Sequence, residues 1–393
     1  MIWSDFLVVL CASYLLLLEC SRTGNYFFYE YGAGLAIRLE KDRMLAKKGF
    51  PMNSLERIGA AIHLQIPDRV PVDLHNFQTA AFATGLPMSE VFRNGALLAE
   101  AMLQAWREFG HDMILLENGT ACNAQACGME VIYQKDSAPV AEKPLISSLV
   151  EVVGLEVRDP YKAFPMCEIL KATRILSKEL GDRVWICARA DQGPMDLAAQ
   201  LRGMDALMMD IATGEEEEAI HALLDYARRV ATRYALALIE CGGHSTSIGE
   251  PIGGPDLMSP RHYRQYAWPQ EKRMVDELKQ HGVILHNHIC GKTDRIVEEF
   301  VATGAQVLEI DHKTDPHKIK DAARNRTCLL GAIDTGLMAF GKPDEIDAAC
   351  KNLIEIWKPD SGFILGPGCA LAPQVPAANI HALIEAAERY GRY

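Results

Sequence analysis

One strand that ends in two histidines and a cysteine constrains the fold of this chain most. The apolar run at 283–285 predicts a buried strand, and His286, His288 and Cys290 follow it at alternate positions. Alternate residues of a strand share one face, so the three side chains point to the same side if the strand continues that far. Imidazole nitrogen and thiolate sulfur are ligands that zinc prefers. One strand end rarely completes such a site, so a further ligand has to come from elsewhere.

Cys369 is the best candidate for that further ligand. It follows a second apolar run, at 363–365, which breaks into the turn Gly366-Pro367-Gly368. Cys369 lies 369 − 290 = 79 residues after Cys290. Only a fold that brings distant strand ends together can join the two cysteines, and a parallel barrel does this because all its strands end on one rim.

Composition fits a globular protein and argues against some partners. The chain has 393 residues, of which 49% are hydrophobic and 23% charged, enough for a large core. Its net charge of −12, without any basic run, argues against a nucleic-acid partner. The 11 cysteines show no disulfide spacing, and several sit in apolar runs, which indicates a reducing compartment and a cytoplasmic location.

The first 51 residues do not match the rest of the chain. Their apolar run at 6–18 is too short to span a bilayer, and Asp5 stands where a secretory signal needs a basic flank. We interpret 1–51 as an N-terminal extension outside the fold, translated upstream of a start at Met52, and expect no membrane association. A weak signal or anchor and a structured extension are the alternatives. The barrel then spans 52–393 and opens with a helix capped by Asn53 or Ser54.

Strands and helices alternate through that second region. Near-continuous apolar runs predict strands buried on both faces, as in a parallel sheet. The count of about eight strands predicts an α/β protein with a (β/α)₈ TIM barrel. A doubly wound open sheet is the alternative, but no glycine-rich dinucleotide motif follows the first strand. We expect strands at about 70–72, 113–116, 184–188, 236–239, 283–288, 306–310, 328–333 and 363–365, with loops at 120–165 and 243–258.

Polar residues follow most of these expected strands. In a barrel, the ends of the strands share one rim, where catalytic residues gather. The residues expected there are Asn118, Asp191, Glu240, His288, Cys290, Asp311, Asp334 and Cys369.

Several short motifs, taken in order from Met52 to Gly391, resemble the uroporphyrinogen decarboxylase superfamily, whose fold is a (β/α)₈ barrel. The motifs are Glu56-Arg57, the run from Pro67 to Val72, Gly193-Pro194, Leu257-Met258-Ser259-Pro260, Gly331-Ala332-Ile333-Asp334, the run from Gly341 to Ile346, and the run from Ile364 to Cys369 with Pro376 and Asn379.

The resemblance implies one of two chemistries. The decarboxylases carry an Arg-Gln-x-Gly-Arg motif after the first strand. In this chain Asp73 follows the first strand instead, and the next arginine is Arg93. The other branch contains zinc-dependent methyltransferases with His-x-Cys and a distant Gly-Cys, which His288, Cys290 and Cys369 match.

This branch implies a Zn²⁺ ion and a cobalamin-type corrinoid as co-substrate. The methyl group would move between the corrinoid and a small thiol such as coenzyme M, or a donor such as an aryl methyl ether or a methylamine. Because no Asp-x-His-x-x-Gly motif is present, we expect a partner protein to carry the corrinoid. A uroporphyrinogen decarboxylase, a zinc-independent lyase and a non-catalytic ligand-binding barrel are the alternatives.

Three ligands from two separate strand ends leave one coordination position open, which is the pattern of a catalytic zinc. Glu240 and Glu250 are candidates for a carboxylate in the fourth position. Asp191 and Asp334 are expected to bind substrate or orient ligands, or else to cap helices. For His286 a place in the barrel core is the better interpretation.

Overall fold

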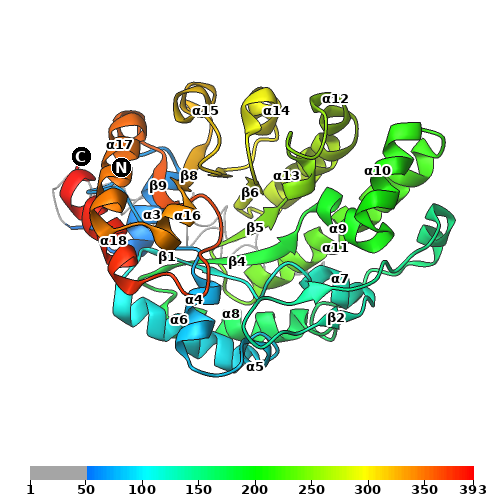
Figure 1. The fold of residues 1–393 in the computed structure, drawn as a ribbon, viewed down its shortest axis with the longest axis horizontal. Helices are drawn as coiled ribbons and strands as arrows, with labels where there is room; N and C mark the ends of the chain where they lie inside the picture. The colour runs from blue at the N-terminus through cyan, green and yellow to red at the C-terminus, as the bar shows by residue number, and fades with distance from the viewer. Residues whose placement is uncertain (1–50) are drawn as a thin grey trace, which may run out of the picture. The chain divides into compact units, whose positions relative to one another are not determined.

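Parallel strands form the central sheet of the computed structural model, which describes residues 51–393. The hydrogen-bonded order of the seven named strands follows the chain (Figure 1). They are β1 (Met113–Leu116), β4 (Trp185–Gln192), β5 (Ser245–Gly249), β6 (Leu285–Ile289), β7 (Val307–Ile310), β8 (Cys328–Ile333) and β9 (Phe363–Pro367). The interpretation of 1–51 as an extension concerns residues that, apart from Pro51, lie outside those described.

A short extended segment around Val72 closes this sheet. Val72 pairs in parallel with Leu365 of β9, and Asp73 pairs in parallel with Met113 of β1. The Asp73 amide donates to the Leu365 carbonyl at 2.9 Å, and the Met113 amide donates to the Val72 carbonyl at 3.2 Å. The segment is therefore the eighth strand, and the predicted (β/α)₈ barrel is confirmed.

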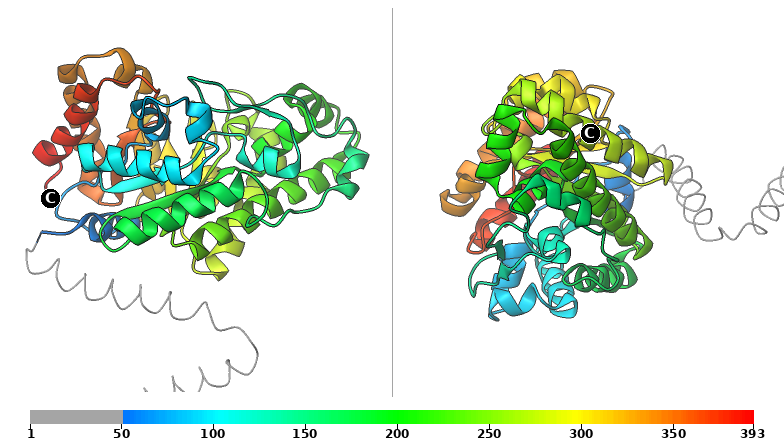
Figure 2. Two further views of the ribbon diagram at one scale, coloured as in Figure 1. Left: turned by 90° about the horizontal axis from the view of Figure 1, so that it is seen from below. Right: turned by 90° about the vertical axis from the view of Figure 1, so that its right-hand side faces the viewer.

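Helices surround the strands (Figure 1), with α6 and α8 side by side along one flank (Figure 2). None of the helices within 51–393 combines the length and the apolar character that a bilayer crossing needs. Their bounds are α3 (Ser54–Ile62), α4 (Phe77–Ala83), α5 (Met88–Val91), α6 (Gly95–Phe109), α7 (Cys122–Cys127), α8 (Met166–Leu180), α9 (Pro194–Arg202), α10 (Met204–Thr213), α11 (Glu217–Glu240), α12 (Pro260–His262), α13 (Trp268–Gln280), α14 (Val297–Ala302), α15 (Pro316–Ala323), α16 (Thr335–Phe340), α17 (Pro343–Trp357) and α18 (Ala377–Tyr390). The irregular stretch 120–165 also contains the short hairpin β2 (Val131–Ile132) and β3 (Val140–Ala141).

Helix α3 begins with the predicted cap. The Asn53 side chain accepts from the Glu56 amide at 2.8 Å, and the Glu56 carboxylate accepts from the Asn53 amide at 2.8 Å, which completes a capping box. Arg57 then binds Asp68 and the fully buried Asp112, each at 2.6 Å. These ion pairs fix α3 against the residues that precede the first strand and β1.

The expected strand at 236–239 is wrong, because these residues form the last turn of α11. A short apolar run fits a buried helix as well as a strand, and here it continues the apolar face of a 24-residue helix. The fourth barrel strand is instead β5, inside the stretch expected to be a loop. Its sequence, Ser245-Thr246-Ser247-Ile248-Gly249, lacks an apolar run because its hydroxyl groups face polar partners inside the molecule.

The barrel interior changes character along its axis. Its lower part, near the start of the strands, is an apolar cluster into which α3 packs Leu55, Ile58 and Ile62. Higher on the same strands, the buried side chains are charged. The barrel members of the lower cluster are Met113, Leu115, Trp185, Cys187, Ile284, Val307, Cys328, Leu330 and Ile364.

Candidate metal centre

Three of the predicted ligands come together at the upper rim. Nε2 of His288 lies 3.0 Å from Sγ of Cys290, and this sulfur lies 4.0 Å from Sγ of Cys369. All three candidate ligand atoms lie within 4.8 Å of one another. Each residue sits where the strand pattern predicted it: His288 inside β6, Cys290 one residue past its end, and Cys369 two residues past β9. The barrel thus joins positions 79 residues apart.

The distances suit a tetrahedral zinc ion. Two thiolates at about 2.3 Å from zinc, at a tetrahedral angle, lie about 3.8 Å apart, close to the observed sulfur–sulfur distance. A nitrogen and a sulfur ligand would lie about 3.5 Å apart, so His288 and Cys290 need to separate by about half an ångström. Two sulfurs and one imidazole are also the donor set that zinc selects. The three residues therefore fit the ion, and they leave its fourth position to another ligand.

A backbone contact orients the imidazole for this role. Nδ1 of His288 lies 3.0 Å from the carbonyl oxygen of Glu309 on the neighbouring strand β7. A carbonyl can only accept, so Nδ1 carries the proton and Nε2 presents its lone pair to the two sulfurs. The loop behind Cys290 is fixed as well, because the Gly291 amide donates to the Asp311 carboxylate at 2.8 Å.

The two thiols differ in acidity. The hydrogen bond from Cys290, together with the nearby His288, holds the pKa of the Cys369 thiol well below its usual range despite burial. The pKa of Cys290 is raised, first because of its hydrogen bond to Cys369 and then because of burial. The thiolate, which is the form that binds metal ions, is therefore favoured at Cys369.

A buried ion network lies beneath the three ligands. Arg189 on β4 binds the carboxylate of Glu117 at 2.8 Å and that of Glu309 at 3.1 Å. Burial alone would lower the pKa of Arg189, but the two carboxylates raise it above its usual value. Burial alone would likewise raise the pKa of Glu309, but Arg189 and His286 hold it well below its usual range. The charged forms of Arg189 and Glu309 thus stabilise each other, and their ion pair positions β7, whose Glu309 carbonyl contacts the His288 imidazole.

Two neighbours extend this network toward the first strand. His75 lies 3.1 Å from Glu117, and this partner raises its pKa to about 9, although burial alone would lower it. Asp73 is fully buried, and neither of its carboxylate oxygens has a hydrogen-bond partner among the described residues. Burial raises the pKa of Asp73 to about 7. His286 is fully buried near Glu309, at 3.6 Å, so the core interpretation of this histidine agrees with its position.

The four predicted carboxylates lie in different places. Asp191 is buried at the end of β4, where its Oδ2 accepts from the Asn123 amide at 2.6 Å. Asp334 caps α16 by accepting from the Gly336 amide at 2.7 Å, which is the helix-cap alternative. Helix α7, which holds Asn123, was missed because its short sequence carries no amphipathic signal.

The two glutamates do not join the three-residue cluster. The placement of Glu240 on the rim is wrong, because it ends α11 five residues before β5 begins, at the opposite end of that strand. Its carboxylate accepts a hydrogen bond from Tyr161. Glu250 directly follows β5 and is fully buried, but its carboxylate accepts from the amides of Met195 and Asp196, at 3.0 and 2.9 Å, at the start of α9.

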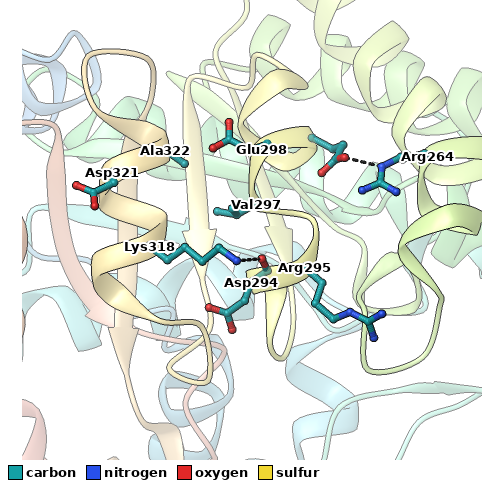
Figure 3. Close-up of a pocket in the computed structure, with 9 residues that line it drawn as sticks. Arg264, Asp294, Arg295, Val297, Glu298, Lys318, Asp321 and Ala322 are labelled. Carbon is teal, nitrogen blue, oxygen red and sulfur yellow. Dashed lines mark hydrogen bonds and ion pairs between the residues drawn. The ribbon is translucent and has the colours of Figure 1, made fainter.

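A separate groove of about 470 Å³ lies between α14 and α15 (Figure 3). Two of its cationic side chains are engaged within the groove. Lys318 donates to the Asp294 carbonyl, and Arg264 binds Glu299. The groove contains no histidine or cysteine, so it offers none of the donors of the metal centre.

Comparison with known proteins adds to this geometry. A family model described as Uroporphyrinogen decarboxylase (URO-D) matches residues 53–390. The chain belongs to this family. The match covers all the elements from α3 to α18, so the family is shown for the whole barrel.

The relatives include both chemistries of the family. The methylcobamide:CoM methyltransferase MtbA of Methanosarcina acetivorans is 27% identical over 353 residues, which cover 85% of this chain and 97% of that protein. A uroporphyrinogen decarboxylase of Syntrophotalea carbinolica is 24% identical over 304 residues, covering 76% and 86%. The predicted resemblance to the corrinoid methyltransferase branch is confirmed by the first of these matches.

A solved structure agrees with the fold. A methyltransferase from Methanosarcina mazei superposes with a TM-score of 0.79 at 24% identity, covering 86% of this chain and 99% of that one. At this identity the likeness supports the barrel architecture alone.

Proposed function

We propose that this protein is a zinc-dependent methyltransferase, which moves a methyl group between a corrinoid and a small molecule. The observation that carries the proposal is the cluster of His288, Cys290 and Cys369 with one open position, in a chain similar over most of its length to methylcobamide:CoM methyltransferases. Because those relatives are named for coenzyme M, a small thiol is the first acceptor to test. Aryl methyl ethers and methylamines are the methyl donors to test for the opposite direction.

The side chains at the rim prepare the site for a thiol. Zinc bound by one imidazole and two thiolates would supply an open position that keeps a substrate thiol ionised at neutral pH. In the transfer, the sulfur lone pair forms the new carbon–sulfur bond, and the electron pair of the cobalt–carbon bond stays on cobalt as Co(I). The Glu309 carbonyl keeps the His288 imidazole in the required tautomer, and Asp311 fixes the Cys290–Gly291 turn.

The corrinoid is proposed to arrive on a partner protein. A metal centre at the rim of a barrel is open to a cofactor presented from outside, and the chain lacks the Asp-x-His-x-x-Gly motif that holds such a cofactor. We also propose a cytoplasmic location, since the described cysteines are all free and suit a reducing compartment.

Decarboxylation is the second candidate, because decarboxylases also occur among the relatives. Its substrate carries several carboxylates that need cationic partners. The first arginine after the opening strand, Arg93, lies over the rings of Tyr133 and Phe164, at 5.0 and 5.8 Å from their centroids. The buried Arg189 is already paired twice with carboxylates. These observations favour methyl transfer.

A spectroscopic assay tests the proposal. The zinc-loaded protein is mixed with methylcobalamin and a panel of thiols, and separately with Co(I) cobalamin and a panel of methyl ethers and methylamines. Cobalt in its methylated and Co(I) states absorbs differently, so transfer in either direction is visible. We expect turnover with at least one pair and loss of turnover in the Cys290→Ser/Cys369→Ser variant. Consumption of uroporphyrinogen without any cobalt change would instead establish the decarboxylase.

A further inference from the structure

Asp191 combines several features that a purely structural carboxylate does not need. Its backbone has a φ of 64°, in the left-handed region that a non-glycine residue rarely adopts. The register between β4 and β5 also shifts between Arg189 and Gln192, as in a β-bulge, so the extra residue re-aims the Asp191 side chain. Bulges and strained backbones of this kind gather beside active sites, where the surrounding structure over-determines them.

Asn123 supplies that surrounding structure. Its side-chain amide donates to the carbonyls of Ala190 and Gln192, at 2.9 and 3.1 Å, on either side of Asp191. Its backbone amide donates to Oδ2 of Asp191 at 2.6 Å. Three hydrogen bonds thus hold the bulge and one carboxylate oxygen in a fixed position.

The second oxygen is left free. Oδ1 of Asp191 has no hydrogen-bond partner in residues 51–393, although the residue is only 2% exposed. A buried hydrogen-bond acceptor without a donor costs free energy. A ligand that donates a hydrogen bond to Oδ1 would remove this cost. Burial raises the pKa of Asp191 to about 8, so a cation beside this carboxyl group is what would hold it ionised at neutral pH.

The position of Asp191 connects it to the metal centre. Gln192, the residue after Asp191, pairs with Gly249 on β5, and Gly249 pairs with His288 on β6, so Asp191 lies near the level of His288 two strands away. Arg189, two residues before Asp191, pairs with Glu309, whose backbone carbonyl contacts His288. Asp191 and the metal ligands therefore border the same ion network, which a small molecule bound at the open metal position would face.

The cations of the buried ion network are already paired with carboxylates. Arg189 is paired with Glu117 and Glu309, and His75 is paired with Glu117. Among the described residues of this network, an anionic tail would have to displace one of these buried pairs, whereas a cationic group would find a free carboxylate oxygen.

We propose that Asp191 binds a protonated amine of the small co-substrate, so that the enzyme prefers an ammonium-bearing thiol or a methylammonium donor over an anionic thiol. This inference rests on the proposed methyl transfer and adds the class of the co-substrate. The ammonium group donates a charge-assisted hydrogen bond to Oδ1 of Asp191, while the thiol or methyl end faces the metal centre.

Calorimetric titration of the zinc-loaded protein, without corrinoid, tests the inference. Three probes are thiols: 2-aminoethanethiol, 2-mercaptoethanol and 2-mercaptoethanesulfonate, which differ only in the group at the other end of the two-carbon chain. The fourth probe is trimethylammonium, a methyl donor without a thiol. We expect the wild type to bind the aminothiol at least about tenfold more tightly than the sulfonate. Preference confined to the aminothiol identifies a thiol acceptor, and binding of trimethylammonium identifies an amine donor.

The Asp191→Asn variant separates recognition from thiol acidity. The three thiols have different acidities, but this difference is the same in both proteins, so the change in preference reports on Asp191. We expect the preference to fall to about threefold or less in this variant. Asp196→Asn is the matched control, because it removes another buried carboxylate whose oxygen Gln200 already engages at 3.1 Å. That control should keep most of the preference.

Several results would overturn the inference. Tighter binding of the sulfonate by the wild type, equal affinities for the three thiols without trimethylammonium binding, or binding of none of the probes would each do so. These outcomes need only the wild type, so they hold even if the variant fails to fold. Failure of the proposed function is distinct, since it would appear as selective binding without methyl transfer from methylcobalamin.

Discussion

The lower half of the barrel interior is apolar, whereas the upper half holds ionised side chains on the same strands. On β4, Trp185 belongs to the lower cluster and Arg189 to the ion network. On β7, Val307 lies below and Glu309 above. On these two strands the change occurs within one or two inward-facing positions, because alternate residues face the interior. A barrel can therefore separate stability from chemistry along its axis without separating them in sequence.

The energetics of the two halves differ accordingly. Burial of apolar side chains in the lower cluster stabilises the fold by about 25 cal/mol per Å². Buried charges in the upper half contribute little net stability, since their attraction is offset by the cost of removing them from water. The ion network is therefore better explained by its position beneath His288, Cys290 and Cys369 than by stability.

The largest effect is expected from the metal ligands. The Cys290→Ser/Cys369→Ser variant should lose stoichiometric zinc and at least about a thousandfold of methyl-transfer activity, because two of three ligands are gone. Thermal unfolding of the metal-free variant should differ little from that of the metal-free wild type, since both residues lie at the rim rather than in a core cluster. Elemental analysis and the cobalt assay measure these two quantities, and zinc retained at one per chain would refute the assignment.

A lower-half substitution should show the opposite behaviour. Trp185→Ala removes a side chain that is 1% exposed and breaks its hydrogen bond to Ser245, so we expect a loss of about 3–5 kcal/mol in the free energy of unfolding. Zinc content of the folded protein should remain at one per chain. Denaturant titration and elemental analysis give both values. Parallel loss of zinc would mean that the two halves are not independent.

Asp73 lies close to the boundary between the halves and should make stability depend on pH. Burial raises its pKa to about 7 in the folded protein, against 3.8 for the unperturbed group. The folded state therefore holds this proton more tightly, so the stabilisation is complete below about pH 4 and is lost as pH rises to about 7. The loss amounts to about 4 kcal/mol, at 1.36 kcal/mol per pKa unit.

The Asp73→Asn variant should remove this dependence. We expect it to match the wild type near pH 4 and to be more stable above pH 7, because the amide carries no charge to bury. Chemical denaturation at a series of pH values measures the difference. An unchanged pH profile in the variant would show that another group is responsible.

The same comparison explains which features the sequence could predict. The cluster of candidate metal ligands was predicted because His288, Cys290 and Cys369 follow clear apolar strands, and the barrel brings these strand ends together. The ion network was missed because Arg189 and Glu309 are 120 residues apart and their pairing depends on strand register. A signal was present, since Glu117, Arg189 and Glu309 each place a charge within or directly after a mainly apolar strand.

The misread fourth strand has a related cause. β5 carries serine and threonine because it faces polar partners, so the apolar pattern that marks the other strands is absent. The nearby run at 236–239 had that pattern but belongs to α11. Glu240 was consequently placed at the wrong end of the barrel. The interpretation of 1–51 stays a prediction.

The smallest effect on stability is expected at Asp334, a rim residue whose role is to cap a helix. Its side chain accepts from the Gly336 amide at the start of α16 and is nearly half exposed, with only a 3.7 Å contact to His312. Asp334→Ala should therefore lower the free energy of unfolding by about 1 kcal/mol, the usual loss for an N-cap. Zinc content and turnover should stay within about twofold of the wild type. Asp334→Ser, which can still cap the helix, should recover most of the lost stability. A large loss of turnover in both variants, with stability restored by serine, would instead assign Asp334 to the chemistry of the rim.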